Sequence, residues 1–322
     1  MADVQLLDAL VSSFEKQKSR GVRWLPYQIT KTLIEKKQLA AAPAAVLSIL
    51  YTRTYAIWMN EKHPRESEVI KNIHLLRQTV GQKFETFMSK EELSPEQIKL
   101  ARAYITQLAD PKAQGDCYEK LQYKVPYFNQ RDSAHPGVGD SMCNMSSMAM
   151  GLALFGVSNP KPDIQYDDAV EQIRVDHYPS YKRTGEGQFR ISNHFGYKYE
   201  SLDGKGSETG LWGGKESYSY DWYVQHALPH LRKGNSITIG IALGEHGHIV
   251  HLLGITKQGL SVHNPYGRVD FEQTDYAKAM NNFANTREGV GSDKGKKEFW
   301  SFEAIKNSPK LHISWIRVTR PK

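Results

Sequence analysis

The sequence predicts an α+β protein in which an all-α helical bundle, residues 1–112, precedes a second domain, residues 113–322, that combines a helix with an antiparallel sheet. Two observations lead to this prediction. Apolar residues recur at three- and four-residue spacing up to about residue 110, as they do on the buried faces of packed helices. Beyond that point a helical stretch, residues 143–155, precedes late segments with the patterns of strands, which is the order of an α+β domain.

Five helices are expected in the N-terminal segment. Proline is tolerated in the first turn of a helix, so Pro26 and Pro43 can each open one. A fourth follows the apolar stripe from Val69 to Phe87, and a fifth begins at Ser94-Pro95-Glu96-Gln97, which has the residues of a capping box. Short links between such helices indicate a bundle. The first of the five carries an apolar stripe of Leu6, Leu7, Leu10, Val11 and Phe14.

The remaining segments define the second domain. Residues 110–115, Asp-Pro-Lys-Ala-Gln-Gly, indicate a linker, so the bundle should be separable there, and the glycine-rich residues 184–220 indicate loops. Ile237, Ile239 and Ile241 alternate with small or polar residues. Residues 248–255 are apolar on both faces apart from two histidines, as a central strand would be. A turn at residues 257–259 then leads into a second strand ending at Asn264.

Composition excludes several classes of protein. Hydrophobic residues make up 39% and charged residues 24%, which allows a sizeable core and argues against global disorder. There is no run of about 18 apolar residues, so no membrane span is predicted. Asp3 and Asp8 precede any cation and no apolar run follows, so we expect no secretory signal and synthesis in a cytoplasm. Two cysteines, Cys117 and Cys143, fit a reducing compartment better than a disulfide framework.

The net charge of +7, with a pI near 9.1, favours anionic surfaces such as nucleic acid, phospholipid or an acidic cell wall. The surplus is spread along the chain in short groups rather than gathered into one basic patch. We therefore predict no nucleic-acid partner and leave contact with an anionic envelope surface open.

Cys143 is the first candidate for chemistry. A loop of small and polar residues, Asp140-Ser141-Met142, runs into a helix that has this cysteine in its first turn. The unpaired amides and partial positive charge of a helix N-terminus favour a thiolate over a thiol. The alternative, an inert buried thiol, is equally compatible with this stretch alone.

Three further residues could serve such a nucleophile. Gln130, thirteen residues upstream, could donate its amide to a developing oxyanion alongside the Cys143 backbone amide. His248 opens the predicted central strand and could act as the base. Asn264 follows sixteen positions later, where the hairpin returns, and its carbonyl could hold the imidazole in one tautomer. This chemistry requires no cofactor, and we expect none.

A zinc site is the rival interpretation of the histidine-rich region. His246 and His248 would share one face of a strand, a spacing that zinc sites use. His251 falls on the opposite face by parity, so these two and His263 do not converge without a bulge. We therefore predict no metal.

Together these motifs resemble the bacteriocin leader-peptidase-like (double-glycine peptidase-like) branch of papain-like cysteine peptidases. The resemblance covers roughly residues 122–270 and rests on VPYFNQ, CNMSSMAM, GHIVHLLGI and HNPYG, in that order. The family's helix typically reads Cys-Gly-Pro-Thr-Ser-x-Ala-Met, and Asn144 and Met145 depart from its Gly-Pro. The resemblance implies a papain-like fold with Cys143 as nucleophile, His248 as base and Gln130 as oxyanion donor. Asn264 would be the orienting residue, where the family more often has Asp.

The resemblance also narrows the substrate. True leader peptidases of this branch are usually fused to a membrane transporter, and no membrane segment is predicted here. An unsignalled, basic hydrolase with a helical accessory domain resembles a phage endolysin, a peptidoglycan-degrading enzyme that reaches the cell wall after the inner membrane is opened. Two other classes stay open: a protein-directed cysteine protease, such as an effector or maturation enzyme, and an inactive peptidase-like binding or virion protein.

Overall fold

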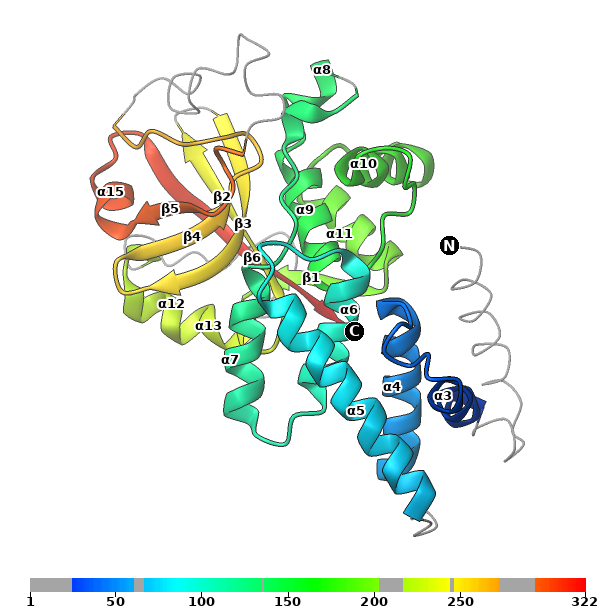
Figure 1. Ribbon diagram of the computed structural model, residues 1–322. Helices are drawn as coiled ribbons and strands as arrows, with labels where there is room; N and C mark the ends of the chain where they lie inside the picture. Colours follow the sequence, from blue (N-terminus) through cyan, green and yellow to red (C-terminus); the bar gives the residue numbers. More distant parts are fainter. Residues whose placement is uncertain (1–24, 61–66, 135, 203–216, 244–245, 273–292) are drawn as a thin grey trace.

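The computed structural model describes residues 25–60, 67–134, 136–202, 217–243, 246–272 and 293–322 (Figure 1). Helices and one antiparallel sheet make up the described chain, which is the predicted α+β class. The first predicted helix, with its stripe from Leu6 to Phe14, lies outside the described residues.

The sheet has six strands in the order β1-β6-β2-β3-β4-β5, and every neighbouring pair is antiparallel. The predicted strands are confirmed as β2, β3 and β4, whereas β1, β5 and β6 were not predicted. The last strand, β6, lies between β1 and β2, so it is an inner strand of the sheet although it comes last in the sequence. The bounds are β1 (Tyr197–Ser201), β2 (Ser236–Leu243), β3 (His246–Thr256), β4 (Gly259–His263), β5 (Glu298–Ser301) and β6 (Leu311–Pro321).

The four predicted helices of the N-terminal segment that fall within the described residues are confirmed as α3 (Leu25–Glu35), α4 (Ala44–Asn60), α5 (Ser67–Met88) and α6 (Pro95–Thr106). At the start of α6 the capping box forms as predicted. The Gln97 backbone amide donates to Ser94 Oγ at 3.3 Å, and the Ser94 amide donates to Gln97 Oε1 at 3.1 Å.

Two expectations about loops are wrong. Residues 111–115 belong to helix α7 (Pro111–Gln122), not to a linker. Asp110 caps this helix by accepting from the amides of Lys112 and Ala113, and Pro111 occupies its first turn, so a pair that resembled a chain break is a helix start. The glycine-rich segment holds helix α11 (Gly185–His194) and strand β1, and its residues 203–216 lie outside the described chain.

Helices cover both faces of the sheet. On one side lies α9 (Cys143–Leu154), whose apolar residues form a core with α10 (Tyr166–His177) and α11. On the other side the sheet packs against α12 (Tyr220–His226), α13 (Leu228–Leu231) and α15 (Phe302–Asn307). Two short helical turns, η1 (Gln130–Asp132) and α8 (Pro136–Gly139), lead into α9.

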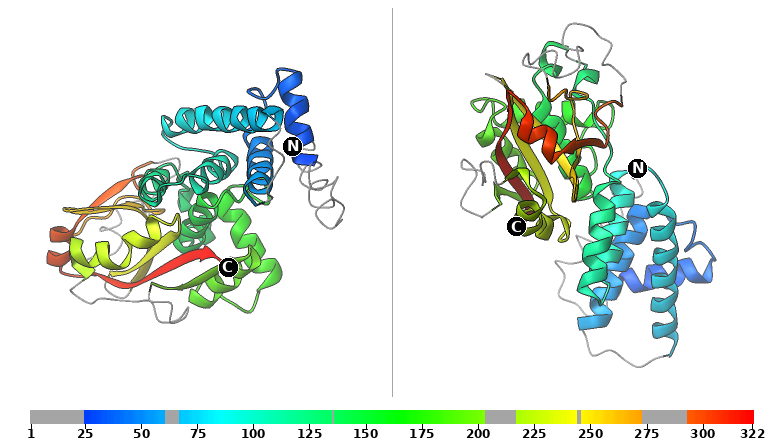
Figure 2. Two further views of the ribbon diagram at one scale, coloured as in Figure 1. Left: turned by 90° about the horizontal axis from the view of Figure 1, so that it is seen from below. Right: turned by 90° about the vertical axis from the view of Figure 1, so that its left-hand side faces the viewer.

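The N-terminal helices share a core with the rest of the chain. They gather at one end of the molecule beside the sheet-containing part (Figure 2). Their apolar cluster includes Leu100 and Ile105 of α6 and continues without a break through Leu121 of α7 and Leu154 of α9. The predicted boundary between residues 112 and 113 falls inside α7, and the division into two domains stays a prediction.

Arg102 of α6 makes a polar link across the same junction. Its Nη1 atom donates to Gly234 O at 2.8 Å and to Leu154 O at 3.3 Å. Its guanidinium group lies 5.3 Å from the ring centre of Tyr118 and 5.1 Å from that of Phe155. One side chain of the helical segment therefore contacts three separate elements of the remaining chain.

In the described part of the chain, no helix combines the length and the apolar character needed to cross a membrane.

Replacing Arg102 should destabilise the whole chain. Arg102→Ala leaves two carbonyl oxygens without their charged donor, and we expect the free energy of unfolding to fall by about 1.5–3 kcal/mol. Urea denaturation followed by circular dichroism measures this change. Lys71→Ala, at an exposed position on α5, is the control and should change it by less than about 0.5 kcal/mol. Equal midpoints for the two variants would contradict the role given to Arg102.

Candidate active site

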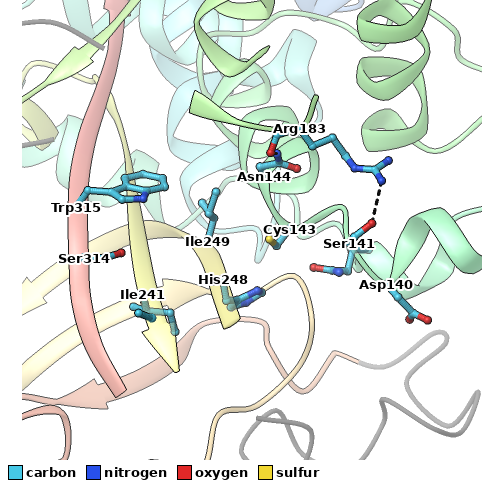
Figure 3. Close-up of a pocket in the computed structure, with 13 residues that line it drawn as sticks. Asp140, Ser141, Cys143, Asn144, Arg183, Ile241, His248, Ile249, Ser314 and Trp315 are labelled. Atoms are coloured by element: carbon cyan, nitrogen blue, oxygen red, sulfur yellow. Dashed lines mark hydrogen bonds between the residues drawn. The ribbon is translucent and has the colours of Figure 1, made fainter. Parts of the chain in front are cut away.

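A cavity of about 520 Å³ lies where the first turn of α9 meets the ends of β2, β3 and β6 (Figure 3). Segments far apart in the sequence meet around it. Its lining includes Gln130, Cys143, Arg183, His248, Ser314 and Trp315.

Close packing of α9 on the sheet positions Cys143, the first residue of that helix. One turn further on, Ser147 Oγ donates to the backbone oxygen of Ile249 in β3 at 3.2 Å. Gly151 lies against β2 so closely that a Cβ atom there would be 2.5 Å from Ser236 Oγ. The small residues of this helix therefore hold the half-buried Cys143 beside the strand that carries His248.

Asn144 stabilises the first turn of α9 through hydrogen bonds. It stands where the peptidase family that the sequence resembles has the Gly of its Gly-Pro pair. Its side-chain amide donates to the backbone oxygen of Arg183, and its Oδ1 atom accepts from the Met145 amide at 2.8 Å. Asn144 is buried. The departure from the family pattern thus brings its own local hydrogen bonds, which connect the start of α9 to the segment before α11.

The β3–β4 hairpin brings His248 and Asn264 together. His248 Nε2 donates to Asn264 Oδ1 at 2.7 Å, and both side chains are buried. Within the described residues His248 Nδ1 has no hydrogen-bond partner, and Figure 3 shows the ring beside Cys143 at the cavity. No direct hydrogen bond between the thiol and the imidazole is present among the described residues. Asn264 itself lies behind His248 and does not line the cavity.

Gln130 lies in the cavity lining and is buried. Its backbone amide donates to Pro265 O at 2.9 Å, which joins it to the turn after Asn264. Its side-chain Nε2 atom donates to Gly139 O at 2.7 Å. An amide nitrogen carries two hydrogens, so one remains for a second acceptor.

Burial makes the cysteine and histidine a neutral pair. It raises the pKa of the Cys143 thiol to about 11, although the backbone amides of Ile249 and Asn144 act in the opposite direction. Burial also lowers the pKa of His248 to about 4, partly offset by the hydrogen bond to Asn264. The amides of the helix N-terminus act toward the thiolate, as expected, but desolvation outweighs them and keeps the pKa of the thiol above its ordinary value.

Two other histidines of the region, His251 and His263, have structural contacts, whereas the side chain of His246 lies outside the described part of the structure. His263 Nε2 donates to Val125 O at 3.1 Å, and its Nδ1 atom accepts from the Lys297 amide at 3.1 Å. His251 Nδ1 lies 3.4 Å from Ser236 Oγ. Burial lowers the pKa of His251 and of His263 to about 3, so both rings are neutral. Among the described residues there is no group of three or more histidine, cysteine or carboxylate side chains that could hold a metal ion.

Sequence reasoning missed Arg183, Ser314 and Trp315. Arg183 Nη1 donates to Glu171 Oε1 at 2.8 Å, and its Nη2 donates to Ser141 Oγ at 2.9 Å beside the cavity (Figure 3). Ser314 and Trp315 come from β6. No motif marks these residues. The alternation of residues 311–318 could have predicted a strand, but not its place next to β2.

Two comparisons with known proteins give no match: neither the curated proteins nor the solved structures contain a significant relative. A family model does match. A helix that presents a cysteine to a histidine on an antiparallel sheet is an arrangement of papain-like cysteine peptidases. The model described as "Peptidase_C39 like family" covers residues 122–292, more than half of the chain, and the chain belongs to this family. Membership supports a cysteine peptidase hydrolase.

The neutral pair predicts how alkylation of Cys143 depends on pH. The reacting species is the thiolate, so a thiol with its pKa raised to about 11 should react with iodoacetamide roughly tenfold faster per pH unit between pH 6 and 9. Rates are measured by mass spectrometry in a Cys117→Ser variant, in which Cys143 is the only thiol. A thiolate–imidazolium pair would instead give a plateau across this range, and observing one would contradict the neutral pair.

Proposed function

We propose that this protein hydrolyses peptide or amide bonds by a Cys-His-Asn mechanism. Cys143 is the nucleophile, His248 the general base and Asn264 the residue that orients the imidazole. Gln130 and the Cys143 backbone amide stabilise the oxyanion. The single observation that carries the proposal is the geometry of His248. Its Nε2 atom donates to Asn264, its Nδ1 atom has no hydrogen-bond partner among the described residues, and its ring lies beside Cys143 at the cavity.

Each chemical step follows from that geometry. His248 Nδ1 takes the proton from Cys143 Sγ as the sulfur attacks the carbonyl carbon, because the resting thiol is not ionised. The carbonyl oxygen becomes an oxyanion, which accepts hydrogen bonds from the Cys143 amide and the second hydrogen of Gln130 Nε2. The imidazolium returns its proton to the leaving amine, and a thioester remains. Water, deprotonated by His248, then hydrolyses the thioester and restores the thiol.

We propose the stem peptides of peptidoglycan as the substrate, and an endolysin-type role in which the protein degrades the cell wall after the inner membrane is opened. Stem peptides carry free carboxylates, and two features of the protein's charge favour such a substrate. The chain has a net charge of +7. At the cavity, Arg183 and Arg174 both pair with the single carboxylate of Glu171. These three side chains together therefore keep a net positive charge.

Loss of either catalytic side chain should abolish release of muropeptides from purified sacculi. We expect Cys143→Ala and His248→Ala each to lower the initial rate by at least about a thousandfold, since residues acting as one unit fail together. Mass spectrometry of the soluble products measures the rate and the bond cleaved. His194→Ala, at an exposed position on α11, is the control and should retain wild-type activity.

The same assay separates the alternatives. Cleavage of a denatured protein without muropeptide release would replace the cell-wall substrate with a protein one. Wild-type turnover by Cys143→Ala would refute the mechanism itself.

A thiol mechanism also predicts which inhibitors act. Prior alkylation with iodoacetamide should remove all activity, because it blocks Cys143 Sγ. Treatment with EDTA followed by desalting should leave activity within about twofold of the untreated protein, since no step uses a metal ion. Loss of activity on chelation that added zinc restores would support the histidine site instead.

A further inference from the structure

Glu298, the first residue of β5, lies behind the proposed catalytic residues and outside the segment that the family model matches. It is buried. Its Oε2 atom accepts from Asn264 Nδ2 at 3.0 Å, and its Oε1 atom accepts from the Val269 amide at 2.7 Å. A hydrogen-bonded series therefore runs from His248 through Asn264 to a buried carboxyl group.

We propose that Glu298 is a positioning residue that fixes the side-chain amide of Asn264 and, through it, the tautomer of His248. The proposal rests on the proposed function, in which His248 acts as a base through Nδ1.

The tautomer follows from the donors and acceptors in this series. A carboxylate only accepts hydrogen bonds, so the amide nitrogen of Asn264 must face Glu298. The amide oxygen then points away and accepts from the Tyr266 backbone amide at 3.2 Å and from His248 Nε2 at 2.7 Å. Because His248 must donate from Nε2, the lone pair of the neutral ring is on Nδ1. That is the atom that has to take the proton from Cys143.

Backbone contacts around Asn264 hold the His248–Asn264–Glu298 series in place. The backbone amide of Asn264 donates to Gly295 O at 2.8 Å, and the backbone oxygen of Asn264 accepts from Tyr127 Oη at 2.9 Å. A Cβ atom on Gly295 would lie 1.9 Å from the Asn264 oxygen, so this close approach requires glycine. Three residues on, the chain enters β5 at Glu298. The carboxyl group is thus carried by a segment that is itself bonded to Asn264.

Glu298 also contributes charge. An asparagine amide is neutral and cannot by itself compensate the imidazolium that forms when His248 takes the thiol proton. The carboxylate on the far side of the amide supplies a negative charge in a buried environment, where screening by water is weak. Its removal should therefore slow the chemical step while leaving the cavity that receives the substrate unchanged.

The test reads the tautomer directly. Protein labelled with ¹⁵N-histidine is studied by long-range ¹H–¹⁵N NMR at pH 8, since burial raises the pKa of Glu298 to about 7 and the carboxyl group must be ionised. The spectrum of His248→Asn identifies the His248 signals. We expect wild-type His248 to carry its proton on Nε2, and Glu298→Ala to show a mixture of both tautomers.

Kinetics with sacculi supply the second readout. Glu298→Ala should lower kcat about 10- to 100-fold with KM within about twofold. The side-chain oxygen of Glu298→Gln can still accept a hydrogen bond from one of the two N–H donors, but its amide nitrogen must then face the other donor. Its kcat should therefore fall by less than that of Glu298→Ala. If Glu298→Ala does not fold, Glu298→Gln carries the test through the same two readouts. Asp167→Asn, which removes another buried carboxyl group, one bonded to Ser146, is the control and should leave the His248 tautomer unchanged.

The outcomes separate this proposal from the one it rests on. Folded Glu298 variants that keep the wild-type tautomer and a kcat within twofold overturn the positioning role. A tautomer that shifts in a protein releasing no muropeptides upholds the positioning role and overturns only the cell-wall substrate.

Discussion

Packing of α9 against the middle of the sheet is the constraint on which the rest of the site depends. Ser147 bonds to the backbone of Ile249, and Gly151 allows the helix to approach β2. These contacts place Cys143 next to β3, the strand that carries His248. A larger residue at position 151 would move the helix away from the sheet and separate the two groups. The proposed chemistry thus depends on small side chains that take no part in it.

Asn264, the proposed orienting residue, is held just as firmly, but by a different part of the chain. Asn264 is bonded through its backbone to Gly295 and Tyr127 and through its side chain to His248 and Glu298. The segment that supplies Gly295 and Glu298 also pairs with the helical part, where Lys296 lies 3.2 Å from Glu91 and 3.1 Å from Glu92. The connection between α5 and α6 therefore contacts the segment that holds Asn264, and the N-terminal helices share a core with α7 and α9.

Burial sets the electrostatic character of the site. The amides around Cys143 favour the thiolate, yet desolvation raises the thiol pKa to about 11 and lowers that of His248 to about 4. A neutral pair of this kind needs its proton transfer to coincide with attack on the substrate. In the proposed mechanism the orientation of the His248 ring then matters more than a preformed charge on it. Asn264 and the carboxyl group of Glu298 are therefore important because they fix that orientation.

The sequence alone was sufficient for the local elements and for residues that form motifs. Apolar spacing and capping residues predicted α3 to α6. Alternation predicted β2, an apolar run predicted β3, and the turn after it predicted β4, because these signals arise from neighbours along the chain. Motifs of neighbouring residues predicted Cys143, His248, Asn264 and Gln130 as candidate site residues in the same way, and their catalytic roles stay a proposal. Only the tertiary structure could reveal β6 between β1 and β2, Trp315 and Arg183 at the cavity, and Glu298 behind Asn264, because those contacts join residues with no shared pattern. It also decided the charge of the site, since a pKa set by burial depends on every atom that excludes water, and the local helix dipole visible in the sequence was the smaller effect.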